Sequence, residues 1–261
     1  MVSASHSFFD DYIDEVTKLE TFVKLTLHGF DFAKNASRVI ELVERNQNIK
    51  ERRLSEATKL EDFANEQQSN GFSYLYTVAI IRLWSILEAS IDDLVIDILL
   101  NQRFKTDEHI KKVKGNLYEF VNLSELDRAE FILESLKTDI KARQKLGIGR
   151  FESLLETVGY EGGIPDIVRK NILEFSQIRN AIMHKNGKVD SRLLKLCPWI
   201  KSKLNDEILL THLDFLTYQL TTYWYFLDLS IRYEPKQPDI DQVIEVHKDL
   251  LNWLQTNSNR I

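Results

Sequence analysis

Three polar side chains with catalytic chemistry lie close together in the segment 175–187: Arg179, Asn180 and His184. Arginine binds phosphate oxygens through a two-pronged hydrogen-bonding group and keeps its charge, while histidine accepts or donates a proton near neutral pH. Cleavage of RNA without a metal ion needs a base for the 2′-hydroxyl proton, an acid for the 5′-oxygen and a cation for the phosphorane charge. Asn180 could hold the imidazole or the phosphate in place, so the three residues suit that reaction.

The segment that carries these residues has the pattern of an amphipathic helix. Its apolar residues recur at intervals of three and four, which places one face of the helix in a core. We expect the helix to begin near Pro165 and to end at Gly187. Residues four apart share a face of a helix, so Asn180 and His184 should project side by side, with Arg179 next to them.

The order Arg179-Asn180-Ala181-Ile182-Met183-His184 resembles the R-x-x-x-x-H motif of the HEPN superfamily (higher eukaryotes and prokaryotes nucleotide-binding domains), in which asparagine often follows the arginine. The resemblance implies an all-α bundle and the metal-independent endoribonuclease activity of toxin, anti-phage and CRISPR-linked members. It implies Arg179 for phosphate binding and charge stabilisation, Asn180 for positioning, and His184 as general acid or base. It also implies a homodimer whose two motif helices face each other across one composite cleft, and an RNA product with a 2′,3′-cyclic phosphate.

Four further basic residues are candidates for binding the substrate. Lys185 and Lys188 follow the motif, near the negative end of the helix dipole. Arg143 and Lys145 belong to a locally basic run that could hold phosphates. The alternative for that run is a solvated helix end and loop.

The most apolar segment, residues 72–101, contains charged residues that could support the site. These charges argue against a membrane span and favour a central helix of the bundle. Glu88 and Asp92 lie on one polar stripe of this helix and could pair with Arg179, because half-buried charges need partners. The stripe could equally face solvent, and the motif itself could be a helix-capping histidine with an ion-paired arginine in a plain bundle.

Sparse glycine and proline, nine and four in 261 residues, together with long periodic segments favour an all-α protein. We expect a HEPN-type bundle over residues 71–261. An N-terminal helical hairpin over residues 1–70 should pack on the bundle or extend from it, with one long polar helix over 35–68 paired against the first helix. Another long helix is expected over 206–233.

Composition limits the partners and the compartment. The net charge of −6 gives no overall field that attracts nucleic acid, so a polyanion site must be a local patch. The single Cys197 excludes an internal disulfide and suits a reducing cytoplasm, and no export signal is visible at the N-terminus. The six histidines are scattered and form no metal-binding motif, so we expect neither a metal site nor a cofactor.

Two functions remain open. The first is a homodimeric HEPN-type endoribonuclease that cleaves single-stranded RNA, acts as a toxin or anti-phage effector, and has an antitoxin or defence protein as a further partner. The second is a non-catalytic HEPN-like module that uses the same groove to bind a protein or a nucleotide. The acidic net charge favours the second function, and the arginine, asparagine and histidine favour the first.

Overall fold

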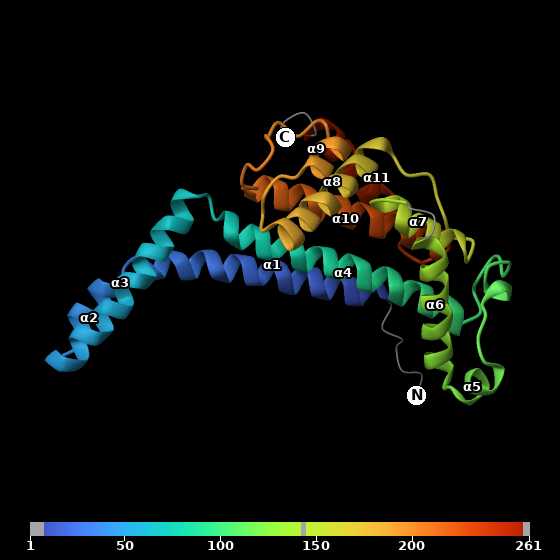
Figure 1. The fold of residues 1–261 in the computed structure, drawn as a ribbon, viewed down its shortest axis with the longest axis horizontal. Helices are drawn as coiled ribbons and strands as arrows, with labels where there is room; N and C mark the ends of the chain where they lie inside the picture. Colours follow the sequence, from blue (N-terminus) through green and yellow to red (C-terminus); the bar gives the residue numbers. More distant parts are fainter. Residues whose placement is uncertain (1–7, 142–144, 258–261) are drawn as a thin grey trace.

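The computed structural model describes residues 8–141 and 145–257, and this part of the chain forms an all-α bundle, as expected (Figure 1). Its α-helices and its one short 3₁₀ helix, η1, are α1 Phe8–Ala33, α2 Ala36–Val43, α3 Gln47–Ser69, α4 Ser73–Leu100, η1 Ile110–Lys112, α5 Leu117–Asn122, α6 Glu125–Lys141, α7 Ile148–Glu156, α8 Asp166–Lys185, α9 Ser191–Leu196, α10 His212–Tyr233 and α11 Ile240–Asn257. No helix among these residues is both long enough and apolar enough to cross a membrane.

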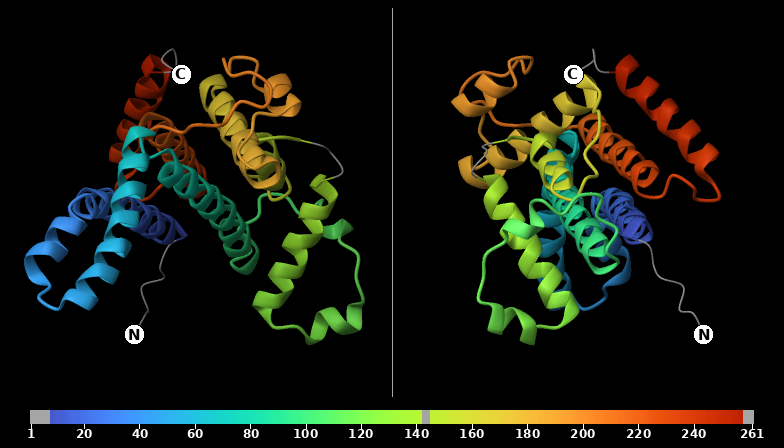
Figure 2. Two further views of the ribbon diagram at one scale, coloured as in Figure 1. Left: turned by 60° about the vertical axis from the view of Figure 1, so that its left-hand side comes forward. Right: turned by 90° about the vertical axis from the view of Figure 1, so that its right-hand side faces the viewer.

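The apolar segment predicted as a central helix is α4, which packs against α1, α6, α8 and α10. Its inward side chains, such as Ile80, Leu83 and Leu87, are completely buried. The arm formed by α2 and α3 projects from one end of α4, and α5 and α6 extend from the other end (Figures 1 and 2). The long α4 helix is therefore the element on which the motif helix and its neighbours rest.

The first helix differs from its expected place. α1 lies along α4 as part of the bundle rather than pairing with a single long polar helix. Tyr12 of α1 stacks on Phe226 of α10 at 3.7 Å between ring centroids, and its hydroxyl donates to Thr222 Oγ1 at 3.1 Å. Because these contacts are buried, α1 closes the core between α4 and α10.

The predicted single helix over 35–68 is two helices. The chain turns at residues 44–46, and the side chain of Asn46 caps α3 by accepting a hydrogen bond from Ile49 N–H at 3.3 Å. α2 then packs against α3, and the backbone and hydroxyl of Ser37 both donate to Glu61, at 2.7 and 2.8 Å. Within the expected N-terminal segment 1–70, the part that projects as a hairpin therefore covers residues 36–69.

The motif helix is α8, which begins after Pro165 as expected and packs against α4, α9 and α10. Phe175 is fully buried, stacks on Tyr218 at 4.8 Å and meets the edge of Trp84 at 5.0 Å. The helix ends in two left-handed residues, Asn186 and then the expected Gly187, with φ values of 53° and 72°. These contacts fix both the rotation and the end of α8.

The segment after α8 is tied back to it by the backbone. Ile208 N–H donates to Gly187 C=O at 2.8 Å, and Val189 N–H donates to Asp206 C=O at 2.9 Å. The expected start of a helix at 206 is therefore wrong: α10 begins at His212, where the side chains of Thr211 and Asp214 form a capping box.

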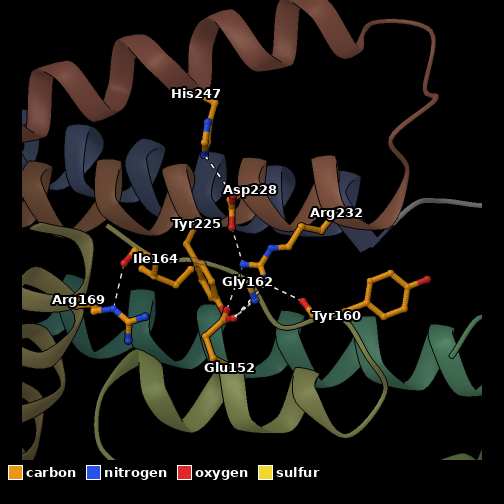
Figure 3. A network of polar contacts seen from close by, with 9 residues as sticks. All are labelled: Glu152, Tyr160, Gly162, Ile164, Arg169, Tyr225, Asp228, Arg232 and His247. Atoms are coloured by element: carbon orange, nitrogen blue, oxygen red, sulfur yellow. Dashed lines mark hydrogen bonds and ion pairs between the residues drawn. The ribbon is translucent and has the colours of Figure 1, made fainter. Parts of the chain in front are cut away.

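A partly buried polar network joins α7, α10 and α11 (Figure 3). Arg232 holds Glu152 with two nitrogens, at 3.1 and 3.2 Å, and also pairs with Asp228. Tyr225 O–H donates to Glu152 at 2.6 Å, and His247 Nε2 lies 3.6 Å from Asp228 Oδ1. Burial raises the pKa of Asp228 and lowers the pKa of His247.

Candidate active site

The motif lies at the C-terminal end of α8, beside a hollow of about 530 Å³. Asn180 and His184 line this hollow, as their four-residue spacing predicts. Gln177 and Lys185 of α8 also line it, as do Asp190 and Arg192 at the start of α9. The hollow therefore joins the end of the motif helix to the beginning of the next helix.

Arg179 lies beside the hollow rather than in its lining, and is linked to it through Asn180. The Nη1 of Arg179 donates to Asn180 Oδ1 at 3.3 Å, while its buried Nε has no hydrogen-bond partner. Arg179 forms no ion pair with the described residues, so it is not the ion-paired arginine of a plain bundle. A guanidinium has five N–H donors and normally finds acceptors for them, so Arg179 retains capacity to bind an anion.

His184 is exposed in the last turn of α8. Backbone groups close part of the helix end, since the N–H groups of Asn186 and Gly187 both donate to Ala181 C=O and Lys188 N–H donates to Lys185 C=O. The imidazole of His184 makes no hydrogen bond to the described residues. It is therefore open to a ligand in the hollow and does not act as a helix cap.

The hollow carries more positive than negative charge. Lys185 and Arg192 are exposed basic residues in its lining, and Asp190 is its acidic residue. Asp190 already caps α9, because its Oδ1 accepts a hydrogen bond from Leu193 N–H at 2.7 Å. An anionic group can thus meet two cations here, although the chain as a whole is acidic.

Of the four predicted substrate-binding residues, two described ones do not line the hollow and a third lies outside the described residues. Lys188 is exposed just beyond α8, where its backbone forms a bridge with Glu207. Lys145 lies before α7, with its Nζ 3.9 Å from Glu156. Arg143 lies outside the described residues. Of the four, Lys185 alone is brought to the site within the described part of the chain.

The expected support of Arg179 by Glu88 or Asp92 is not met, because each carboxylate pairs with another cation. Arg150 lies 3.3 Å from Glu88, and Lys137 lies 2.6 Å from Asp92. Burial raises the pKa of Asp92 although Lys137 opposes the shift. These four residues line a separate hollow of about 190 Å³, so the polar stripe of α4 is neither solvated throughout nor part of the motif site.

Gln177, Asp190 and Arg192 are the lining residues that the sequence analysis missed. Gln177 is three positions before Asn180 and seven before His184, so helical spacing alone could have found it. Asp190 is a recognisable helix-capping residue type. Arg192 carries no such signal, because its place depends on the turn that folds α9 back onto α8.

Comparisons of the chain with known protein families, with curated proteins and with solved structures found no match. In the described part of the chain, no group of three or more histidine, cysteine, aspartate or glutamate side chains could hold a metal ion.

Proposed function

We propose that this chain is a cytoplasmic, metal-independent endoribonuclease of HEPN type. The observation that carries the proposal is the open hollow at the end of α8, where His184 and Asn180 share the lining with Lys185 and Arg192. An acid–base group, an amide and two cations are the groups that binding and cleaving a phosphodiester require. Arg179 adds a third cation through its hydrogen bond to Asn180.

In the proposed reaction the 2′-oxygen of a ribose attacks the adjacent phosphorus and the bond from phosphorus to the 5′-oxygen breaks. A base removes the 2′-hydroxyl proton, and an acid donates a proton to the leaving 5′-oxygen. The products are a 2′,3′-cyclic phosphate and a 5′-hydroxyl, and no water is consumed. His184 serves as acid or base, while Arg179 with Lys185 and Arg192 stabilises the additional negative charge of the phosphorane.

A homodimer completes the proposed site. One described protomer brings a single histidine to the hollow, whereas the attacked and leaving oxygens lie on opposite sides of the phosphorus. A second copy related by a two-fold axis would place a second His184 across the phosphate. Toxin or anti-phage action, with an antitoxin or defence protein as partner, is the biological setting that the HEPN resemblance implies.

The single imidazole is also the observation that favours the second candidate function. A groove with cations and one histidine can bind a nucleotide or an acidic peptide without cleaving it. In that case the purified protein would bind single-stranded RNA or a nucleotide and release no product. The His184→Ala change would lower the affinity only modestly.

The test is cleavage of labelled single-stranded RNA in EDTA by wild-type protein and by the His184→Ala variant. We expect wild-type protein to release 2′,3′-cyclic phosphate ends, and the variant to be slower by about a hundredfold or more, the usual contribution of acid–base catalysis. His28→Ala is the matched control because His28 is exposed on α1, away from the hollow. Loss of wild-type cleavage in EDTA, or full activity of His184→Ala with unchanged helicity, would refute the proposed mechanism.

A further inference from the structure

The hollow lined by Asn180 and His184, the motif hollow, is one of two at the end of α8. The second hollow there, of about 370 Å³, lies on the other side of the helix end. It is formed where the corner between α3 and α4 meets the end of α8 and the segment 207–209. His184 and Lys185 line the motif hollow, and the next two residues, Asn186 and Gly187, line this one. A single ligand that crosses the end of α8 would therefore meet both hollows.

The notable side chain in this second hollow is Gln67. It is only 5% exposed, and its buried Oε1 has no hydrogen-bond partner. The remainder of its amide makes no hydrogen bond to the described residues either. A buried acceptor without a donor costs free energy. A rotation of the Gln67 side chain that brings Oε1 to the hollow would let a ligand N–H donate to it and would remove that cost.

The rest of the lining limits the chemistry of the ligand. Glu66 and Glu207 belong to the lining, and no lysine, arginine or histidine of the described residues lies there. A phosphate group would be repelled here, whereas N–H donors would be favoured. Tyr74, which is 64% exposed, offers an aromatic surface at the same hollow, and aromatic side chains commonly stack on unpaired bases.

We propose that this hollow is a nucleobase subsite that takes one unpaired base with an exocyclic amino group. Once turned to the hollow, the amide of Gln67 offers an acceptor for the amino group and a donor for a ring nitrogen, as in the pairing of glutamine with N6 and N7 of adenine. The inference rests on the proposed nuclease function: the phosphate to be cleaved lies at His184 and a neighbouring base enters the second hollow. It identifies the substrate as RNA with an unpaired, amino-bearing base next to the cleaved bond.

The probe for this subsite is adenosine, because it carries the base without a phosphate and so does not depend on the motif site. We expect calorimetry to show adenosine binding to wild-type protein and, equally well, to His184→Ala. Gln67→Leu should weaken adenosine binding by at least about tenfold, the effect of one lost hydrogen bond to a buried group. Gln68→Leu, which changes the exposed neighbouring amide, should leave the affinity unchanged.

Purine riboside tests the recognition of the amino group, because it keeps the ring and lacks that group. We expect it to bind about tenfold more weakly than adenosine to wild-type protein, and as weakly as adenosine binds to Gln67→Leu. Equal binding of the two nucleosides, unchanged adenosine binding by Gln67→Leu, or no binding of adenosine at millimolar concentration would each overturn the subsite.

The outcome for the subsite is separate from the outcome for the nuclease. Adenosine binding that depends on Gln67, in a protein that cuts no RNA, would support the base subsite and refute the cleavage reaction. Cleavage that depends on His184, in a protein that does not bind adenosine, would support the cleavage reaction and refute the base subsite.

Discussion

Arg179 is the residue whose environment is most specific to the proposed reaction. Its side chain makes one hydrogen bond to the described residues, to Asn180, which lines the hollow with His184, and its buried Nε is left without an acceptor among them. A substrate phosphate would supply acceptors, and the developing charge of the phosphorane would bind more tightly still. Arg179 should therefore affect the chemical step more than the stability of the fold.

Substitutions of Arg179 should separate charge from shape. We expect Arg179→Ala to lower kcat by about a hundredfold or more, the typical loss for a group that stabilises the transition state. Arg179→Lys keeps the charge and loses the two-pronged geometry, so its kcat should lie between those of the wild-type and alanine proteins. Single-turnover cleavage of single-stranded RNA measures both effects, and thermal unfolding checks the fold. Equal activity of all three proteins would contradict a role for Arg179.

His247 is the residue at which a dependence of stability on pH can be predicted. It stacks on Trp224 at 4.4 Å between ring centroids, and burial lowers its pKa from the ordinary value of 6.5. The folded protein thus binds the proton less readily than the unfolded chain does. The contribution of neutral His247 is complete above pH 6.5 and is lost as the pH falls from 6.5 through the lower pKa of the folded state.

The matched variant for this prediction is His247→Phe, which keeps a ring against Trp224 and removes the titration. Between about pH 7.5 and about pH 5.5, wild-type protein should lose more stability than the variant does, because only wild-type protein carries the titration of His247. Chemical denaturation at the two pH values measures the difference, and His28→Phe on the exposed face of α1 serves as control. Parallel losses in wild type and His247→Phe would show that His247 does not control this slope.

Among the elements, the start of α7 approaches the middle of α8 closely at Gly147. Gly147 precedes α7 with φ 54° and ψ −135°, a conformation that residues with a side chain rarely adopt. A Cβ at this position would lie 3.0 Å from the Cα of Leu173 on α8. The two helices can approach this closely because the residue between them has no side chain.

Gly147→Ala should therefore destabilise the fold by about 1–3 kcal/mol, the cost of backbone strain at one residue. Gly149→Ala is the matched control, since residue 149 lies within α7 and its added Cβ would make only an ordinary contact with Lys145 at 3.7 Å. That control should be neutral or stabilising by up to about 1 kcal/mol. Urea denaturation of both variants gives the comparison, and an unaffected Gly147→Ala would mean that the backbone relaxes there at little cost.

An element could be predicted from the sequence where a local pattern of residues determines it, and could not where distant elements do. α8 and its shared face were predictable because Phe175, Ile178 and Ala181 repeat with the helical period and the chain ends the helix at Asn186 and Gly187. The break between α2 and α3 was not, because residues 44–46 are polar like the solvated helices on either side. The burial of Gln67 was not predictable either. Gln67 lies on a polar helix, and other elements cover it.

The same distinction applies to the site. The arrangement of Asn180 and His184 needed only local geometry, which a four-residue spacing supplies. The contribution of Arg192, and the partners of Glu88 and Asp92, depend on how distant helices pack. Paired charges on separate helices leave no periodic signal, because any of several cations could satisfy the same carboxylate.

At the scale of the whole molecule, the proposed reaction requires two copies of the chain. We expect sedimentation at micromolar concentration to give twice the 30.6 kDa mass of one chain. RNA cleavage per chain should fall on dilution as the dimer dissociates, because neither copy alone holds two imidazoles at the phosphate. A protein that sediments as a monomer and still cleaves RNA at full rate would rule out the composite cleft.

The burial of α1 has a practical consequence for anyone who wishes to shorten the chain. An expression plasmid that begins at residue 71 would omit Tyr12 and its stack on Phe226, leaving the apolar sides of α4 and α10 in water. The product would aggregate or be degraded, and its inactivity would say nothing about the nuclease. Deletions that spare the first helix and remove only the projecting hairpin are the informative truncations.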